Sequence, residues 1–229
     1  MVLQPATRAV NIRPLALIFD AYGTLFDVAS VADVCAGRAP DPVRLIALWR
    51  TKQLEYSFLR CLTGAAAYVD FWEVTSDALD FAAQRLGLRL SAADREAALQ
   101  GWLQVRPYAD VQSSLERLSA GRTCMILSNG SPSMLREAVH SAGLAGRFQA
   151  VLSVDVVHVY KPSPRVYQLA VDAIGLPTDQ LMFVSSNGWD AAGARAFGLP
   201  VAWINRSASP VERPGFAPSA VLPDLAMPR

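Results

Sequence analysis

Short apolar runs that end in polar residues recur along the chain. They cover residues 15–20, 123–128, 181–185 and 201–204, with a weaker run over 150–154. Continuous apolar runs of this length are typical of buried parallel strands, and helical patterns separate them at intervals suited to β–α–β crossovers. Ligands bind beyond the carboxyl ends of parallel strands. We therefore expect the active site at the edge of the sheet where these strands end, an edge that carries Asp20, Ser128, Asp155 and Ser185.

The segment between the first two runs is far longer than one crossover needs. Apolar positions recur near i, i+3, i+4 and i+7 over residues 45–62, 66–86 and 92–105, which predicts three helices. Proline-containing stretches at 38–42 and 106–110 predict loops near the two borders of this helical segment. We therefore expect an α/β protein in which a Rossmann-like parallel-sheet core (1–29 and 106–229) carries an inserted helical cap (30–105). The first fourteen residues are expected to fray, and the Pro-rich tail after Asn205 is predicted to be loop.

Composition narrows the class of protein. With 52% hydrophobic and 18% charged residues and a net charge of +1, the chain falls in the ordinary globular class and shows no footprint for nucleic acid or an anionic membrane. No apolar stretch is long enough to span a membrane. The three cysteines are far apart and lack CxxC spacing, which favours a reducing compartment. We expect a cytoplasmic protein whose partners are small molecules.

Several familiar catalytic patterns are absent from the sequence. There is no G-x-S-x-G elbow, no P-loop, no G-x-G-x-x-G and no H-E-x-x-H. Only two histidines occur, His140 and His158, so a histidine-based triad has little material, and both are expected to be structural.

The segment 19–27 carries the chemistry. It reads FDAYGTLFD, in which a predicted strand ends in Asp20, Gly23 permits a tight turn and Thr24 offers a hydroxyl. A strand ending in D-x-x-G-T-L/V resembles the first motif of the haloacid dehalogenase superfamily, whose aspartate forms a covalent ester with the substrate. The later motifs of that superfamily follow in order: SNGSP with Ser128, YKPSPRVY with Lys161, and VSSNGWD with Ser185, Asn187 and Asp190.

The residue two positions after Asp20 refines this resemblance. Superfamily phosphatases usually carry a second aspartate there as general acid, whereas this chain has Tyr22. An alkoxide that leaves phosphorus must be protonated, but halide is a weak base and needs only solvation. With WRTKQLEY in the predicted cap, the chain resembles the L-2-haloacid dehalogenase family. Thr51 departs from the glutamine usual at that position, and the C-terminal end lacks an obvious helix.

The resemblance implies a role for each of the charged residues. Asp20 would attack C2 of the haloacid, and Asp190 would activate the water that hydrolyses the ester, with Ser185 and Asn187 positioning the water or the base. Two carboxylates in one cleft raise each other's pKa unless a cation lies between them, which is the role expected of Lys161. The chain has only two lysines among its 21 Lys and Arg residues, so we do not expect Lys161 to be an ordinary solvent-exposed surface residue.

The resemblance also implies the substrate-binding residues. Arg50 would receive the halide and Asn129 would donate a hydrogen bond to it, while Ser128 and the Asn129 backbone N–H would meet the substrate carboxylate. Thr24 and Tyr167 would hold Asp20 and Lys161 by hydrogen bonds. The apolar wall that strips water from the halide would consist of Tyr22, Leu54, Phe71 and Trp189.

The expected function is hydrolysis of short-chain L-2-haloalkanoic acids to D-2-hydroxy acids, with no metal and no cofactor. The resemblance and the long apolar helix of the cap also suggest a homodimer. Two alternatives stay open: a Mg²⁺-dependent phosphatase of the same superfamily, and a non-catalytic doubly wound binding domain.

Overall fold

A single parallel sheet forms the centre of the molecule. The computed structural model describes residues 14–226, so most of the tail expected to fray lies outside the described residues. All strand pairs are parallel, and the strand order is β3-β2-β1-β4-β5-β6. The α/β class with a parallel sheet is confirmed. The strands are β1 (Ala16–Phe19), β2 (Thr123–Ser128), β3 (Ala150–Ser153), β4 (Leu181–Ser185), β5 (Val201–Ile204) and β6 (Ala220–Leu222).

Strand β1 lies in the middle of the sheet and fixes where its neighbours end. Its four residues are almost completely buried, as expected for a strand covered on both faces. Phe19 pairs with Ile126 of β2 and with Val184 of β4, so the carboxyl ends of the three strands reach the same edge. The side chains that follow these strands are therefore neighbours in space.

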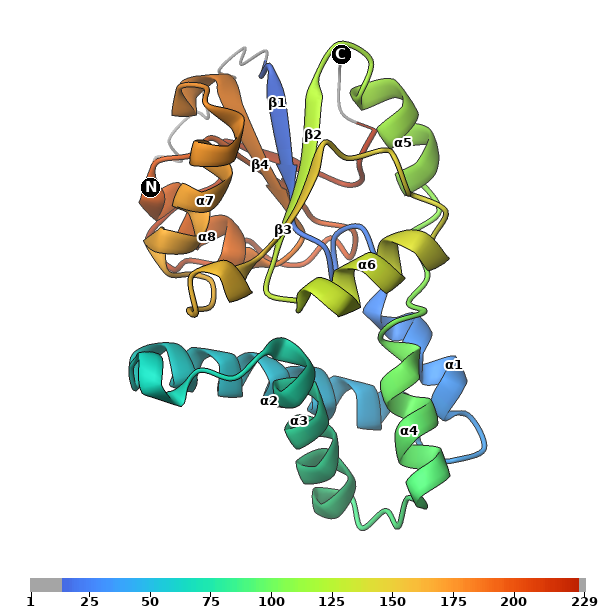
Figure 1. Cartoon of the computed structure of the whole chain (residues 1–229). Helices are drawn as coiled ribbons and strands as arrows, with labels where there is room; N and C mark the ends of the chain where they lie inside the picture. The colour runs from blue at the N-terminus through green and yellow to red at the C-terminus, as the bar shows by residue number, and fades with distance from the viewer. Residues whose placement is uncertain (1–13, 227–229) are drawn as a thin grey trace, which may run out of the picture.

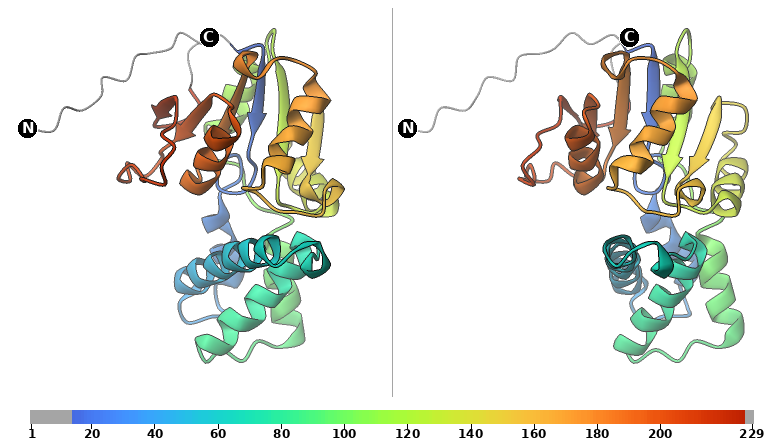
Figure 2. Two further views of the ribbon diagram at one scale, coloured as in Figure 1. Left: turned by 90° about the vertical axis from the view of Figure 1, so that its left-hand side faces the viewer. Right: turned by 60° about the vertical axis from the view of Figure 1, so that its left-hand side comes forward.

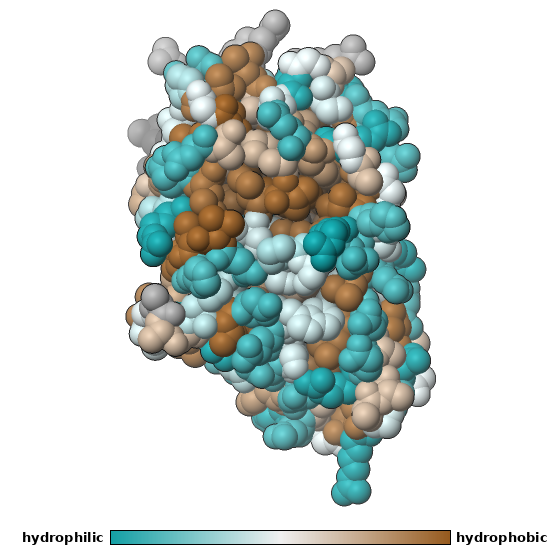
Figure 3. All heavy atoms as spheres, viewed as in Figure 1, coloured by the Kyte–Doolittle hydropathy of each residue, from teal (hydrophilic) through white to brown (hydrophobic). Residues whose placement is uncertain are grey.

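Two helices cover each face of the sheet. Helices α7 (Pro164–Ile174) and α8 (Gly188–Phe197) lie on one side, and α5 (Val111–Leu118) and α6 (Pro132–Ser141) lie on the other (Figures 1 and 2). Apolar residues at helical spacing pack each helix onto the sheet. Strand β3 is an edge strand, and the surface that carries it is markedly apolar (Figure 3).

Four further α-helices lie between β1 and α5. They are α1 (Val31–Cys35), α2 (Pro42–Leu62), α3 (Phe71–Arg85) and α4 (Ala92–Gly101), and together we call them the helical insert. The insert lies beyond the carboxyl ends of the strands (Figure 1). Side chains of Asp41, Asp70 and Ser91 each accept a backbone N–H three residues on, which fixes where α2, α3 and α4 begin.

Two predicted helices were too long, and one strand was not predicted. The helix predicted over 66–86 begins at Phe71, because Asp70 caps it, and only a 3-10 turn (Ala65–Ala67) precedes it. The helix predicted over 92–105 ends at Gly101, a poor helix former. The tail predicted to be loop contains β6, which extends the sheet by pairing with β5.

The tail is also tied to the loop that follows β1. Arg206 Nη1 lies 2.9 Å from both carboxylate oxygens of Asp110, and Arg206 Nη2 donates to the backbone carbonyl of Thr24. Asp110 also accepts the backbone N–H of Leu225 at 2.8 Å. The C-terminal segment therefore braces the loop that presents Asp20. In the described part of the chain, no helix is long and apolar enough to cross a membrane.

Candidate active site

A small cavity lies between the strand ends and the helical insert. It encloses about 250 Å³ of empty space, including the part open to solvent. The sheet side contributes its floor and the insert contributes part of its wall, which brings together residues more than a hundred positions apart. All but one of the lining residues were predicted from the sequence: Asp20, Tyr22, Arg50, Leu54, Phe71, Ser128, Asn129 and Trp189, with Gly130 in addition.

A buried lysine joins two carboxylates at the floor of the site. Lys161 is fully buried, and its Nζ lies 3.1 Å from Asp20 Oδ1 and 2.7 Å from Asp190 Oδ2. Asp20 follows β1, Asp190 lies in the first turn of α8, and Lys161 precedes α7. Burial lowers the pKa of Lys161, but the Asp190 and Asp20 carboxylates outweigh it, so its pKa lies above the ordinary value. Lys161 is therefore a fixed positive charge.

The pKa of Asp190 lies above the usual range for a carboxyl group. Burial raises it to about 6, with Asp20 acting in the same direction, while Lys161 and the Tyr167 hydroxyl act in the opposite direction. Asp190 has no exposed surface, in contrast to Asp20, which borders the cavity. The two carboxylates thus differ in environment, as different roles would require.

One oxygen of Asp20 accepts most of the hydrogen bonds. Asn187 Nδ2 donates to Oδ2 at 2.7 Å, Thr24 Oγ1 donates to it at 3.0 Å, and Ser185 Oγ lies at 3.5 Å. The other oxygen, Oδ1, accepts from Lys161 Nζ. This arrangement holds the carboxylate in one orientation and leaves Oδ1 as the less hydrogen-bonded oxygen.

Two predicted contacts differ from the structure. Tyr167 was expected to hold Lys161, but its hydroxyl donates to Asp190 Oδ1 at 2.8 Å, because α7 packs against α8 and places Tyr167 beside that carboxylate. Asn187 was expected to position the water or Asp190; its side chain donates to Asp20, and its part in positioning the water stays a prediction. Ser185 lies between the carboxylates, 3.4 Å from Asp190 Oδ2.

Polar groups from β2 and its loop form one side of the cavity. Ser128 Oγ accepts the backbone N–H of Gly130 at 3.1 Å, so its hydroxyl proton can be donated elsewhere. Asn129 Oδ1 accepts the backbone N–H of Lys161 at 3.0 Å, which directs its amide Nδ2 away from that contact. Both side chains are buried donors beside Asp20.

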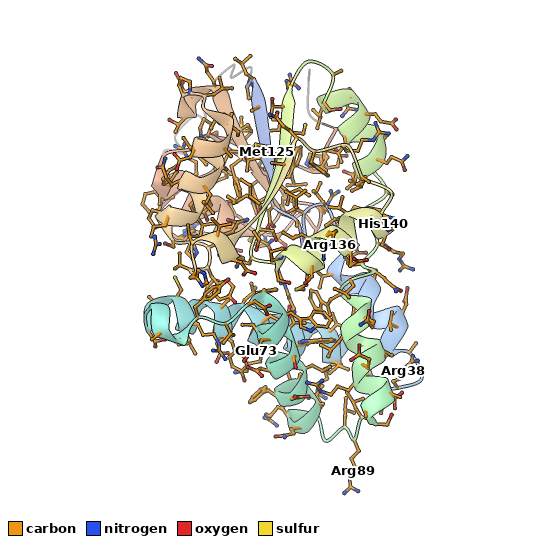
Figure 4. The ribbon with its side chains drawn as sticks, in the orientation of Figure 1. Arg38, Glu73, Arg89, Met125, Arg136 and His140 are labelled. Atoms are coloured by element: carbon orange, nitrogen blue, oxygen red, sulfur yellow. The ribbon has the colours of Figure 1, made fainter. Side chains whose placement is uncertain are left out.

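Arg50 brings the second cation, from helix α2 of the insert. Burial lowers its pKa, and the opposing charge of Asp20 is the next contribution, acting in the opposite direction. Its Nη2 lies 3.5 Å from the Tyr22 carbonyl, and its Nη1 lies 3.3 Å from Gln53 Oε1. Arg89, by contrast, points away from the site at the far end of the insert (Figure 4).

The apolar wall comes from both halves of the molecule. Tyr22 is buried, which raises the pKa of its phenol, and its hydroxyl donates to the Trp102 carbonyl at 3.2 Å. Trp189 packs edge-on against Phe58 of α2, with ring centroids 5.2 Å apart. Thr51, which departs from the glutamine of the family, is exposed on α2 and does not line the cavity.

Two glycines with a role in the site were missed by the sequence reasoning. A Cβ at Gly130 would lie 3.0 Å from Tyr22 Cε2, so the loop approaches the cavity wall closely there. A Cβ at Gly193 would lie 2.5 Å from both the Tyr167 hydroxyl and Pro162 Cβ. The motif SNGSP contained a signal for Gly130, but Gly193 lies within an ordinary helical pattern and gave none.

Lysine occupies the space between the two acidic side chains of this site. Within residues 14–226, no group of three or more His, Cys, Asp and Glu side chains is arranged to hold a metal ion. Asp20 Oδ1 and Asp190 Oδ2 both accept a hydrogen bond from Lys161 Nζ.

Known proteins place this fold and site in one family. The family model of haloacid dehalogenase-like hydrolases matches residues 15–198. The chain is 48% identical to an (S)-2-haloacid dehalogenase of Pseudomonas sp. (strain YL), over 88% of this chain and 87% of that one. It is 40% identical to haloacetate dehalogenase H-2 of Moraxella sp. (strain B), over 91% and 93%.

Solved structures agree with these relatives. A crystal structure of an L-2-haloacid dehalogenase superposes with a TM-score of 0.90 and 43% identity, covering 93% of this chain and 95% of that one. The L-2-haloacid dehalogenase from Xanthobacter autotrophicus with chloropropionic acid covalently bound gives a TM-score of 0.85 at 38% identity, with the same coverage. The chain therefore belongs to the L-2-haloacid dehalogenase family of the haloacid dehalogenase-like hydrolases.

The crowding at Gly193 leads to a testable prediction. Gly193→Ala should lower the free energy of unfolding by about 1–3 kcal/mol, because its methyl group would overlap Tyr167 and Pro162. In an ordinary helix interior the same change raises stability by about 1 kcal/mol. Ala196→Gly, at an exposed position of α8, measures the ordinary propensity effect for comparison. Urea unfolding of both variants decides the sign, and a stabilised Gly193→Ala protein would contradict the prediction.

Proposed function

We propose that this protein hydrolyses short-chain L-2-haloalkanoic acids to D-2-hydroxy acids. The observation that carries the proposal is an Asp20 carboxylate that borders an apolar-walled cavity, held beside buried Lys161 and facing Arg50. A carboxylate next to a fixed cation stays ionised and is a nucleophile, and a cation across the cavity favours the departure of an anion. The names of the relatives point to the same substrate class.

The first half-reaction joins Asp20 to the substrate. Asp20 Oδ1, which accepts fewer hydrogen bonds than Oδ2, attacks C2 on the side opposite the halogen. An O–C bond forms as the carbon–halogen bond breaks, and the bonding electron pair leaves with the halide. Back-side attack inverts the configuration at C2. The product of this step is an ester of Asp20 plus a free halide ion.

The departing halide and the substrate carboxylate need separate partners. Arg50 and the Asn129 amide receive the halide, while the Ser128 hydroxyl and the Asn129 backbone N–H hold the carboxylate. The apolar side chains of Leu54, Phe71 and Trp189 exclude water, which strengthens these charge interactions.

The second half-reaction hydrolyses the ester. Water attacks the carbonyl carbon of the Asp20 ester, and Asp190 accepts the proton of that water. The acyl C–O bond of the ester breaks, while the bond from that oxygen to C2 of the substrate stays intact, and the leaving alkoxide takes up the proton that Asp190 accepted. The hydroxyl oxygen of the product therefore comes from Asp20, and the water oxygen enters the Asp20 carboxylate. Lys161 stabilises the negative charge of Asp20 before the ester forms and after it is hydrolysed, and the negative charge of ionised Asp190.

The helical insert acts in this proposal as a cap domain. The division falls near residues 30 and 105, with the core formed by 1–29 and 106–229. Tyr68 of the insert donates a hydrogen bond to Asp155 of the core, and Tyr160 of the core donates to the Val69 carbonyl at 2.5 Å. These contacts keep the cap, and with it Arg50, against the strand ends.

The assay that tests the proposal uses L-2-chloropropionate without added metal. We expect chloride release, D-lactate as the product and no loss of activity in EDTA. Asp20→Asn should reduce turnover by roughly three orders of magnitude or more, because an amide cannot form the ester. L-lactate as product, abolition by EDTA, or undiminished chloride release by Asp20→Asn would each reject the mechanism. Mg²⁺-dependent phosphate release from an aryl phosphate would favour a phosphatase instead.

The raised pKa of Asp190 predicts a pH dependence for ester hydrolysis. Above a pKa of about 6 Asp190 is ionised and can accept a proton, and below it the base is lost. In the ester the charge of Asp20, which raises the pKa of Asp190, is gone, so the acidic limb of ester hydrolysis should lie below pH 6. The ester of Asp20 should accumulate on the acid side of that limb, visible by mass spectrometry of acid-quenched protein. Because the Tyr167 hydrogen bond lowers the pKa of Asp190, Tyr167→Phe should shift the acidic limb of the pH dependence to higher pH. A shift to lower pH would contradict the assignment.

We also propose that the protein is a cytoplasmic homodimer. All three cysteines are unpaired, as a reducing compartment favours. Helices α2 and α3 expose Leu59, Leu62 and Phe81 to solvent, with Leu62 82% exposed. Sedimentation should give twice the mass of one chain, and Leu62→Asp should shift the equilibrium towards single chains. A wild-type monomer at micromolar concentration would reject the dimer.

A further inference from the structure

Two fully buried polar residues of the insert lie behind Arg50. Gln53 of α2 and Thr75 of α3 have no exposed surface, and neither lines the cavity. Gln53 Oε1 accepts from Arg50 Nη1 at 3.3 Å, and Gln53 Nε2 donates to Thr75 Oγ1 at 2.9 Å. Thr75 Oγ1 donates in turn to the carbonyl of Phe71 at 2.6 Å. The chain of hydrogen bonds thus runs from the guanidinium to the backbone of α3.

The direction of these hydrogen bonds is fixed by the threonine. A hydroxyl has one proton, and that of Thr75 is used on the Phe71 carbonyl, so towards Gln53 it can only accept. The amide must therefore turn its Nε2 to Thr75 and its Oε1 to Arg50. In the flipped orientation an amide N–H would face the guanidinium, donor against donor.

The remaining contacts of Arg50 are looser. Its Nη2 lies 3.5 Å from the Tyr22 carbonyl, and its Cζ lies 5.9 Å from the centre of the Trp102 ring. Within residues 14–226, no carboxylate forms a salt bridge with Arg50, and Gln53 supplies its side-chain acceptor. A neutral acceptor holds the guanidinium without cancelling the charge that a departing anion requires.

We propose that Gln53 and Thr75 are positioning residues for the halide-accepting Arg50. The inference rests on the role given to Arg50 in the proposed function. Thr75 sets the orientation of the Gln53 amide, and the amide oxygen aims the guanidinium at the carbon–halogen bond. The pair therefore acts on the first half-reaction, in which the halide leaves, and leaves ester hydrolysis unaffected.

The test measures first-turnover halide release from the chloro, bromo and iodo forms of L-2-halopropionate. Thr75→Val removes the hydroxyl at nearly constant volume, and Thr75→Ser is the matched control that keeps it. Thr75→Val should slow chloride release roughly three- to tenfold, bromide less and iodide least, because chloride is the poorest leaving group. Thr75→Ser should stay near wild type. The rate of ester hydrolysis should be the same in all three proteins.

Gln53→Glu provides a second, independent variant. A carboxylate at this position still accepts from Arg50, but it pairs with the positive charge that the halide needs. Gln53→Glu should therefore also slow chloride more than iodide, although its acceptor is in place. Equal slowing of the three halides in both Thr75→Val and Gln53→Glu would mean a purely structural role and would overturn the proposal.

Arg50→Gln tests whether Arg50 itself receives the halide. If this variant discriminates between halides more strongly than wild type, Arg50 receives the halide as proposed. Unchanged discrimination in Arg50→Gln would reject that role, and with it the proposed function of Arg50. Stronger discrimination in Arg50→Gln but not in Thr75→Val would leave the function standing and reject only the positioning role of Gln53 and Thr75.

Discussion

The ammonium group of Lys161, buried without any exposed surface, is the constraint on which the site depends. An ammonium taken out of water costs several kcal/mol unless charged partners surround it. Asp20 and Asp190 provide those partners at 3.1 and 2.7 Å. They come from the ends of β1 and the start of α8, so the pairing exists only when β1 and β4 have the observed register. The three charges therefore pair only in the observed sheet, and their pairing in turn stabilises that arrangement of the strands.

The helical insert completes the charge balance of the site. On the sheet side, two carboxylates face one ammonium, which leaves an excess of negative charge where an anionic substrate must bind. Arg50, from α2, lies across the cavity and supplies the second positive charge. The two positive and two negative side chains thus balance, so an anion that enters the cavity does not meet a net negative charge. Placement of the insert is consequently an electrostatic requirement as well as a matter of enclosing the cavity.

Sequence predicted the residues of the site better than their contacts. Asp20 and Lys161 were predictable because each lies in a short motif that can be recognised from neighbouring residues alone. The partner of Tyr167 was not, because it depends on how α7 packs against α8. Gln53 and Thr75 look like ordinary helix residues, and only tertiary packing buries them. The start of α3 was missed because one capping residue, Asp70, sets it. Strand β6 was missed because it forms through only three residue pairs with β5.

Tyr22 links the chemistry of the leaving group to the architecture. A halide needs no proton when it departs, so position 22 is not required to carry an acid. Its phenol instead donates to the Trp102 carbonyl of the insert, and its ring packs against Trp102 and Phe26. Trp102 in turn packs against Trp49, one residue before Arg50. Tyr22 therefore fastens the insert to the core, and through Trp102 and Trp49 it is linked to the helix that carries Arg50.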